Sequence, residues 1–516
     1  MKQKTDIKYF VRSIVLLITF FIFKSYYSIL IPISGDEAYH WEWSRHLALG
    51  YYDHPPMVGW VISVTRALGR IVGGPELFWT RLPALLSITG ILIIAYRLLV
   101  KTTGKKRLGF YGILLLGVTP LFALGGNIIT TDQPLIFFSG LTIYLLYQAL
   151  FEDRDRYWYY AGLAAGCAFL SKFLSILIIP GILLFLILSP PDRAWLRRKQ
   201  PYLAALIAAL VYLPNIVWNA RYDWATYKFN LTSRHQSAFS LEKFAESVAG
   251  QLGVIGPILF PLLLIGLAYA CWRGFKDQDR RALFFSLIPL FVLVFLGLIG
   301  FFRTVGAHWS ALAYLPATVA FFYIYRDKFD QINLKSIGWW ALHTGLVLSL
   351  ILTVIIHLLP VYAHLIPEQF ELAGNEVEVD HTDLGPLYGW EELGQQINQL
   401  QEDYDEEIFF ISPSYAFSSL SSFNTPGHPF VRVYGSGSVY GQNYKYWNNY
   451  QDLEGKDAVF LYKELSDSYF DKLNDSFEEV RQLESLEIEN PAGNYVRTFY
   501  FIYCEGFDGS DWQEDK

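Results

Sequence analysis

Long apolar segments recur along the first 360 residues of this chain, and most of them approach the length of a membrane-spanning helix. A helix needs about 20 predominantly apolar residues to cross the hydrocarbon core. Backbone polar groups find no water there, so only helices and closed barrels can cross. The chain has 516 residues, of which 53% are apolar and only 17% are charged, unlike an ordinary soluble protein. The sequence therefore predicts an α-helical polytopic membrane protein.

The apolar segments also give the expected number of transmembrane helices. The run between residues 158 and 189 is interrupted at Ser171-Lys172-Phe173, so its two short halves either span separately or form a re-entrant pair. We expect about 11 transmembrane helices, within a range of about 9 to 13. The candidate segments are 11–31, 80–100, 108–127, 134–151, 158–171, 173–189, 201–218, 248–272, 282–302, 309–325 and 337–359.

Lysine and arginine placement predicts the orientation of these helices. With a cytoplasmic N-terminus, the inner loops carry about twice as many basic residues as the outer ones. The basic segment 1–12 leads into the first apolar run without a small-residue cleavage site, which favours a retained helix over a signal peptide. We therefore expect a multi-pass membrane protein, with the loop 32–79 and the region after Pro360 on the outer side.

The region after residue 360 differs in composition from the rest of the chain. It contains about 30 acidic residues against about 8 basic ones, while the part before it is basic by about 15 charges. We expect residues 1–360 to form a transmembrane domain and residues 361–516 an acidic extracytoplasmic α/β domain. We expect a helix at 388–401 and a helical turn at 467–473. The expected strands are 407–411, 429–434, 457–462 and 494–504.

Two adjacent carboxylates, Asp36 and Glu37, follow the first apolar run. Acidic side chains beside a membrane are costly unless they have a function. A structural explanation also exists, because Ser34 and Glu37 have the spacing of a helix capping box. Both can hold, since a cap would fix the geometry of a carboxylate that acts as a general base toward a hydroxyl group.

The segment Asp53-His54-Pro55-Pro56 lies in the same outer loop. Two successive prolines restrict the backbone, so the simplest interpretation is a rigid turn. A carboxylate beside an imidazole can also bind a divalent metal or a phosphate group. The sequence therefore leaves two interpretations of Asp53 and His54, a turn or a ligand pair.

Further ionisable side chains stand where apolar segments end. Lys172 is embedded between two apolar runs, where a lysine usually pairs with an anion. Arg81 and Arg303 are similar, and such cations would suit a lipid phosphate. Asp132 and His308 have structural explanations as a helix cap and a helix-end histidine. The candidate substrate-binding residues are Lys172, Arg81, His54, Asp132 and His308.

The sequence shows no pattern typical of disulfide-rich, nucleic-acid-binding or nucleotide-binding proteins. The three cysteines are far apart, which implies neither a disulfide framework nor a zinc site. Basic patches with interleaved aromatic residues, typical of nucleic-acid binding, do not occur. No glycine-rich phosphate loop follows an expected strand. No cofactor is required by these patterns, and a divalent metal is the one that Asp53 and His54 would allow.

The first outer loop resembles that of bacterial membrane glycosyltransferases related to dolichyl-phosphate-mannose protein mannosyltransferases and to the aminoarabinose lipid A transferase. The likeness rests on Gly-Asp-Glu-Ala-Tyr-His-Trp-Glu-Trp-Ser from Gly35 and on His-Leu-Ala-Leu-Gly-Tyr-Tyr-Asp-His-Pro-Pro from His46. It extends over residues 10–360. The acidic region after it resembles the less characteristic outer domain of some members. Further matching segments are 78–83, 130–134, 171–173, 213–219 and 308–309.

This resemblance implies a C-type glycosyltransferase fold like that of glycosyltransferase family 39, in a bacterial inner membrane, with its active site on the outer face. The implied donor is a sugar on polyprenyl phosphate. By the same resemblance Asp36 is the general base, Glu37 orients the acceptor, and Lys172 faces the lipid phosphate, with Arg81 a weaker candidate. Attack opposite the phosphate would invert the anomeric carbon.

At Asp53 the chain differs from one of the two related groups of enzymes. The aminoarabinose transferase has a glutamate there that takes part in a metal site, followed by a lysine, whereas this chain has Asp53 and His54. The His-Pro-Pro version is closer to the mannosyltransferases. The resemblance therefore names neither the sugar nor the acceptor, which can be a glycolipid, lipid A, a glycan or a protein.

Two alternatives to a glycosyltransferase follow from the sequence. A transporter or flippase of a lipid-linked saccharide would have Lys172 and Asp132 lining its path. It would favour charges at mid-membrane and paired repeats, and the sequence has neither. A receptor whose acidic tail binds a partner would leave Lys172 and the Asp36-Glu37 loop unexplained.

Overall fold

The computed structural model describes residues 2–230, 239–329, 336–365, 369–372, 375–378, 385–404, 408–434, 440–447, 449–463 and 467–510. The chain divides into two compact units. The membrane unit comprises Met1–Ile29, Ala48–Gly50 and His54–His357. The C-terminal unit comprises Leu30–Leu47, Tyr51–Asp53 and Leu358–Lys516, so the Asp36-Glu37 segment belongs to the same unit as the acidic region.

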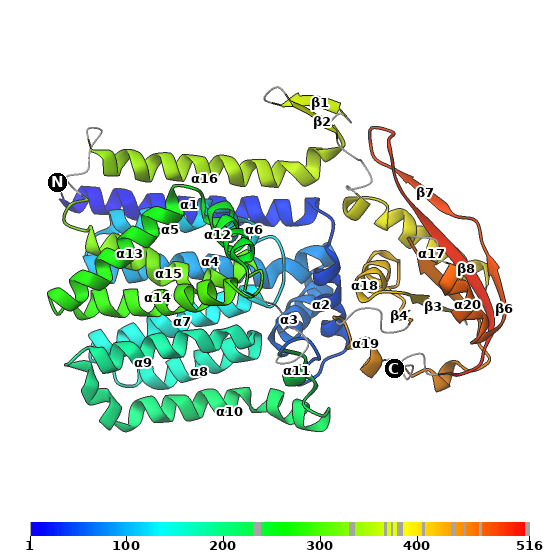
Figure 1. Cartoon of the computed structure of the whole chain (residues 1–516), viewed down its shortest axis with the longest axis horizontal. Coiled ribbons are helices and arrows are strands. Elements are labelled where there is room, and N and C mark those ends of the chain that lie inside the picture. The colour runs from blue at the N-terminus through cyan, green and yellow to red at the C-terminus, as the bar shows by residue number, and fades with distance from the viewer. Residues whose placement is uncertain are drawn as a thin grey trace. The chain divides into compact units, whose positions relative to one another are not determined.

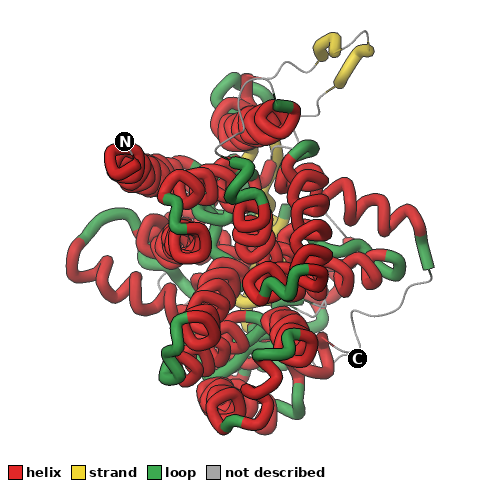
Figure 2. The backbone as a smooth tube through the Cα atoms, turned by 90° about the vertical axis from the view of Figure 1, so that its left-hand side faces the viewer, coloured by secondary structure: helices red, strands yellow, loops and turns green. Residues whose placement is uncertain are grey.

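The membrane unit is built from helices alone in its described part, and Figure 2 shows several of them end-on. Seven helices of the described chain are long and apolar enough to cross a membrane: α1, α4, α7, α10, α13, α14 and α16. The expected number of about 11 stays a prediction. The helices are α1 (Lys2–Leu30), α3 (Met57–Val72), α4 (Glu76–Thr103), α5 (Lys106–Val118), α6 (Pro120–Leu124), α7 (Asp132–Phe151), α8 (Tyr157–Ser171), α9 (Ile178–Leu188), α10 (Lys199–Arg221), α11 (Ala225–Lys228), α12 (Leu241–Ile255), α13 (Leu259–Lys276), α14 (Arg280–Gly300), α15 (Ala311–Ile324) and α16 (Ile337–Tyr362).

Burial separates central from peripheral helices in this unit. Residues 311–323 of α15 are all buried, as expected for a helix that is apolar on every face. In contrast, α1, α10 and α16 expose large apolar side chains such as Ile18, Leu206 and Ile351. An exposed apolar surface of this kind suits contact with lipid. Helices α1 and α16 both run from left to right in Figure 1, and near their C-terminal ends the Tyr27 hydroxyl donates a hydrogen bond of 2.8 Å to the His357 carbonyl.

Three apolar segments are interrupted at residues that disfavour a continuous helix. The expected break at Lys172 is confirmed, because α8 ends at Ser171 and the 3-10 helix η1 (Phe173–Leu177) follows. The expected single run 248–272 is wrong. It falls on α12 and α13, which separate at Gly256 with a φ of +109° and at the proline that follows. Likewise α5 and α6 separate before Pro120.

The C-terminal unit contains a mixed sheet in the order β4-β3-β5-β8-β6, and β7 pairs with β8. Strand β3 is parallel to β4 and β5, whereas β8 is antiparallel to β5, β6 and β7. Ile411, Phe460 and Ile502 form part of its core. The strands are β1 (Gln369–Leu372), β2 (Asn375–Glu378), β3 (Phe409–Ser412), β4 (Val431–Val433), β5 (Ala458–Tyr462), β6 (Phe477–Gln482), β7 (Leu486–Glu489) and β8 (Tyr495–Phe507). The α-helices are α2 (Gly35–Arg45), α17 (Trp390–Asp403), α18 (Tyr415–Asn424), α19 (Tyr444–Trp447) and α20 (Asp467–Asn474).

The expected α/β character of the C-terminal region is confirmed. The expected helix is present as α17 and the expected helical turn as α20, and β3, β4, β5 and β8 occupy the four expected strand segments. Residue 407, where the first of these strands was expected to begin, lies outside the described residues. Helix α18 and the strands β6 and β7 were not expected. The boundary at residue 360 stays a prediction, and α2 packs against α18 within the C-terminal unit.

Candidate active site

A capping box fixes the start of α2, which carries Asp36 and Glu37. The Glu37 amide donates to the Ser34 hydroxyl at 3.4 Å, and the Ser34 amide donates to Glu37 Oε2 at 3.1 Å. The capping box expected from the sequence is thereby confirmed. Glu37 is completely buried, whereas Asp36 at the preceding position is exposed.

Among the described residues, Asp36 has one hydrogen-bond partner. The Tyr415 hydroxyl, at the first residue of α18, donates to Asp36 Oδ1 at 3.0 Å. Burial raises the pKa of the Tyr415 phenol, and the negative charge of Asp36 raises it further. The phenol therefore stays protonated at neutral pH and acts as a donor. This contact joins two residues that lie 379 positions apart in the sequence.

Asp53 anchors the loop to the segment 441–443. Its Oδ2 accepts a hydrogen bond from the Tyr39 hydroxyl at 2.7 Å, and its Oδ1 accepts one from the Gly441 amide at 3.2 Å. The Tyr39 hydroxyl in turn accepts from Asn443 Nδ2 at 2.6 Å. Burial, followed by the charge of Asp53, raises the pKa of Tyr39 well above its ordinary value. Both oxygens of a nearly buried carboxylate are therefore committed to structural hydrogen bonds.

The surroundings of Asp53 do not fit a metal ion. Protein zinc sites use at least three protein ligands, and calcium sites use more. Across the described part of the chain, no three His, Cys, Asp or Glu side chains gather closely enough to hold an ion. His54 is half-buried and belongs to the membrane unit. Among the described residues, Asp53 and His54 therefore lack the further ligands that a metal centre needs, and both oxygens of Asp53 hold the loop instead.

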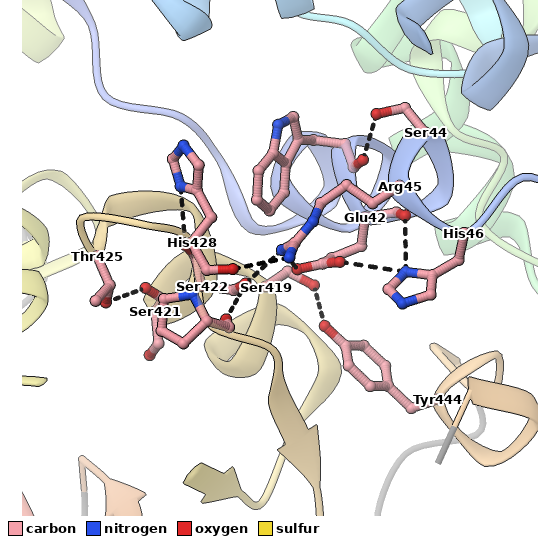
Figure 3. A network of polar contacts seen from close by, with 12 residues as sticks. Glu42, Ser44, Arg45, His46, Ser419, Ser421, Ser422, Thr425, His428 and Tyr444 are labelled. Atoms are coloured by element: carbon pink, nitrogen blue, oxygen red, sulfur yellow. Dashed lines mark hydrogen bonds and ion pairs between the residues drawn. The ribbon is translucent and has the colours of Figure 1, made fainter. Parts of the chain in front are cut away.

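Within α2, Arg45 forms an ion pair with the buried Glu42, and the same arginine connects α2 to α18 and to the loop after it (Figure 3). Glu42 is fully buried and accepts a hydrogen bond of 3.0 Å from Arg45 Nη1. Arg45 also donates to the Ser422 hydroxyl at 2.9 Å and to the His428 carbonyl at 2.7 Å. Its guanidinium carbon lies 4.7 Å from the centre of the Trp41 ring. The helix that carries Asp36 is therefore held by the C-terminal region.

Replacing Arg45 by alanine is expected to destabilise the C-terminal unit by about 3 kcal/mol, because the buried Glu42 carboxylate loses its strongest partner. His46, whose Nδ1 lies 3.5 Å from Glu42, replaces only part of it. The measurement is the Tm of the purified protein, together with its rate of limited proteolysis. Arg481→Ala is the control, because Arg481 is exposed and its guanidinium stacks on Tyr503. An Arg45→Ala protein with the wild-type Tm would contradict the role of this pair.

Lys172 and Asp132 form a buried ion pair within the membrane unit. Lys172 follows α8 in an extended conformation, and Asp132 begins α7. The Lys172 Nζ lies 2.9 Å from each Asp132 oxygen, and the two side chains are only 11% and 10% exposed. The sequence predicted an anionic partner for Lys172, and among the side chains of this protein that partner is Asp132.

His308 joins this pair. It lies in the 3-10 helix η4 (Ala307–Ser310), and its Nε2 is 3.6 Å from Asp132 Oδ2. The Thr130 hydroxyl donates to the same carboxylate at 3.3 Å. Half of the His308 side chain is exposed, in contrast to the buried pair. We refer to Lys172, Asp132 and His308 as the Lys172 cluster.

Arg81 has a different setting from the Lys172 cluster. It is fully buried in α4, and its Nη1 donates to the Ser28 carbonyl of α1 at 2.6 Å. Lys24, which sequence reasoning missed, is also buried and donates to the carbonyls of Phe122 and Ala123 in α6. Both cations therefore connect α1 to neighbouring helices. The Arg303 guanidinium lies over the Trp309 ring, 5.0 Å from its centre.

The structure thus places the candidate residues in two sets. Asp36, Glu37 and Asp53 belong to the C-terminal unit, and Lys172, Asp132 and His308 form one cluster in the membrane unit. Sequence reasoning missed Tyr415, Gly441 and Asn443. Their partners lie more than 370 positions away, and no local pattern indicates such contacts.

Comparison with known proteins places the chain among membrane glycosyltransferases. Residues 53–218 match the family model of dolichyl-phosphate-mannose-protein mannosyltransferase. The chain is 30% identical to a lipid A galacturonosyltransferase of Rhizobium johnstonii, over 66% of this chain and 68% of that protein. It is 26% identical to an undecaprenyl phosphate-alpha-4-amino-4-deoxy-L-arabinose arabinosyl transferase of Pseudomonas paraeruginosa, over 48% and 43% of the two chains.

Solved structures share the fold at low sequence identity. ArnT from Cupriavidus metallidurans bound to undecaprenyl phosphate superimposes with a TM-score of 0.62 and 13% identity, over 95% of this chain and 97% of that one. The mycobacterial arabinofuranosyltransferase AftD gives a TM-score of 0.52 and 12% identity, over 96% of this chain and 40% of that one. The expected C-type glycosyltransferase fold with a C-terminal α/β domain is therefore confirmed.

Proposed function

Because the chain belongs to the membrane glycosyltransferase family that includes lipid A galacturonosyltransferases, we propose that it transfers a sugar from polyprenyl phosphate to a hydroxyl group of lipid A, with Asp36 as the general base. The observation that carries the assignment of Asp36 is its geometry. It is an exposed carboxylate at the capped start of α2, with one oxygen held by Tyr415. A flippase has no need of a positioned base of this kind.

The proposed reaction is a single displacement. The second carboxylate oxygen of Asp36 takes the proton of the acceptor hydroxyl as the hydroxyl oxygen bonds to the anomeric carbon. The bond between that carbon and the phosphate oxygen breaks, and polyprenyl phosphate leaves as an anion. Attack from the side opposite the phosphate inverts the configuration. Glu37 is committed to the cap, so its proposed role is to hold α2 and thereby orient Asp36 toward the acceptor.

The Lys172 cluster is the proposed binding site for the donor phosphate. A lysine ammonium carries three N–H donors, and two of them meet the oxygens of Asp132. Its positive charge would stabilise the phosphate as negative charge develops on the leaving oxygen. His308 is half-exposed beside Asp132 and can add a ring N–H. Arg81 and His54 are not proposed as direct ligands of the phosphate. Arg81 is fully buried, and both residues are proposed to support the site from within the membrane unit.

The proposed donor is a hexose derivative, and a uronic acid in particular. Support comes from the relative that aligns over two thirds of its length, which is a galacturonosyltransferase. The aminoarabinose transferase aligns over less than half of its length. Asp53 is hydrogen-bonded on both oxygens, so the proposed reaction does not depend on a divalent ion at that residue.

The proposed orientation has a cytoplasmic N-terminus and an active site on the outer face of the inner membrane. Its support is the excess of lysine and arginine in the loops assigned to the inside. Nucleotide sugars are cytoplasmic, so a lipid-linked donor suits this side of the membrane. Asp36 and the region after residue 360 would then share the outer compartment.

The direct test uses the purified full-length protein in detergent. Undecaprenyl phosphate carrying galacturonic acid, and separately 4-amino-4-deoxyarabinose, is supplied with lipid A, and the product mass is measured. We expect transfer from the uronic acid donor. Transfer from the aminoarabinose donor alone would overturn the proposed hexosyl specificity. A protein that forms no product from either donor would contradict the proposed function, since a flippase leaves both compounds unchanged in detergent.

A further inference from the structure

We propose that Tyr415, from the C-terminal region, is a positioning residue for the Asp36 base and that this region thereby completes the catalytic site. The inference rests on the proposed function, because it assigns a second residue to the same chemistry. It gives the acidic region a role beyond that of an appended domain. Tyr415 acts through Asp36 rather than on the reacting atoms.

The first support is the contact between Tyr415 and Asp36. The phenol oxygen lies 3.0 Å from Asp36 Oδ1, within the range of a good hydrogen bond. Within the described ranges, no hydrogen bond reaches Asp36 Oδ2, and the residue is exposed. A carboxylate held by one oxygen cannot rotate freely about its terminal bond. The second oxygen is therefore presented in a fixed direction, as a base needs when it must meet an acceptor hydroxyl.

The second support is the way the Tyr415 ring is held. A Cβ added to Gly441 would lie 2.1 Å from Tyr415 Cγ, so the backbone at residue 441 closes directly over the ring. Gly441 has a φ of +75°, which a side chain would strain further. The Tyr39 ring centre lies 4.8 Å from that of Tyr415. The Tyr415 ring is therefore packed between the Gly441 backbone and the Tyr39 ring, which limits its movement.

Asp53 holds the residues that pack around the Tyr415 ring. Its two oxygens accept hydrogen bonds from the Tyr39 hydroxyl and the Gly441 amide, and these are the two residues that lie against the Tyr415 ring. In addition, a Cβ on Gly35 would come within 2.8 Å of the Ala416 Cβ, so the first turns of α2 and α18 are in contact. Asp53, Gly441 and Tyr415 thus form a continuous support that ends at Asp36.

The protonation of Tyr415 suits this role. Burial and the nearby charges of Asp36, Asp53 and Tyr440 all raise its pKa. The hydroxyl therefore remains a donor at neutral pH. A hydrogen bond to an ionised group contributes more than one between neutral groups. Loss of the Tyr415 hydroxyl should consequently impair the Asp36 base without changing how the substrates bind.

The test is Tyr415→Phe in the full-length protein, measured as kcat and as KM for donor and acceptor. We expect kcat to fall about 10-fold, while both KM values change less than about 2-fold and the Tm is unchanged. Tyr503→Phe is the matched control, because it also removes a hydrogen bond from a tyrosine to an aspartate, Asp457, in the same unit. This control is expected to keep the wild-type kcat.

A double-mutant cycle with Asp36→Glu distinguishes a purely structural role of Tyr415 from the proposed positioning of Asp36. The longer side chain moves the carboxylate away from the phenol, so Tyr415→Phe should change the kcat of that variant by less than about 2-fold. An equal loss of kcat in both backgrounds, or an unchanged kcat in Tyr415→Phe alone, would overturn the inference. Failure of the proposed function looks different, since the wild-type protein would then transfer no sugar.

Discussion

Asp36→Asn is expected to lower the kcat for sugar transfer by about 1000-fold, because general base catalysis contributes factors of this size. Asparagine has the same shape and can still accept the hydrogen bond from Tyr415, so the start of α2 should keep its structure. The amide cannot take a proton from the acceptor. The measurement is kcat for transfer to lipid A, with the Tm as a check that the variant folds.

Asp403→Asn is the matched control for this prediction. Asp403 is an exposed carboxylate at the end of α17 in the same unit, so the substitution makes the same chemical change away from α2. We expect it to transfer sugar at the wild-type rate. Normal activity of the Asp36→Asn protein would refute the assignment of Asp36 as the base, whatever the control shows.

Lys172→Met is expected to abolish donor binding and also to destabilise the membrane unit by about 3 kcal/mol, since it leaves the Asp132 carboxylate buried without its ammonium partner. Both Asp132 oxygens lie 2.9 Å from Lys172 Nζ, and the carboxylate is 10% exposed. The two effects are read separately. The Tm reports the stability, and the Kd for undecaprenyl phosphate reports the phosphate site.

The double variant Lys172→Met/Asp132→Asn distinguishes the two roles of the lysine. Removing the unpaired charge should restore much of the Tm, because a neutral side chain costs less to bury. It should not restore binding of undecaprenyl phosphate. The reference is Asp132→Asn alone, which keeps Lys172 and should bind the lipid at least as well as the wild type. Equal Kd values for Asp132→Asn and the double variant would exclude Lys172 as a phosphate ligand.

Local patterns were sufficient to predict the elements on which the candidate site stands. The spacing of Ser34 and Glu37 predicted the capping box, and a lysine between two apolar runs predicted the break after α8. Periodicity also predicted α17, whose buried residues recur at helical spacing, and a continuous apolar run predicted β5, which is buried at every residue. It failed at Gly256, where one apolar run contains two helices and hydrophobicity alone gives no sign of the turn.

Long-range contacts of the site could not be predicted from the sequence. Helix α18 has the sequence YAFSSLSSFN, whose serines resemble a loop, and it becomes a helix by packing against α2. Asp53 was expected as a turn or ligand residue, and only the structure joins it to Tyr39 and Gly441. The pairing of Lys172 with Asp132 likewise depends on how α7 and α8 pack together.

The proposed reaction is a single displacement, in which Asp36 removes the proton of the acceptor hydroxyl and the acceptor oxygen attacks the face opposite the lipid phosphate. The most direct test is the anomeric configuration of the sugar on lipid A, determined by NMR after transfer from a donor of known configuration by the purified protein. Inversion of that configuration is the predicted result. A product with the configuration of the donor would contradict the single displacement and the role of Asp36 in it.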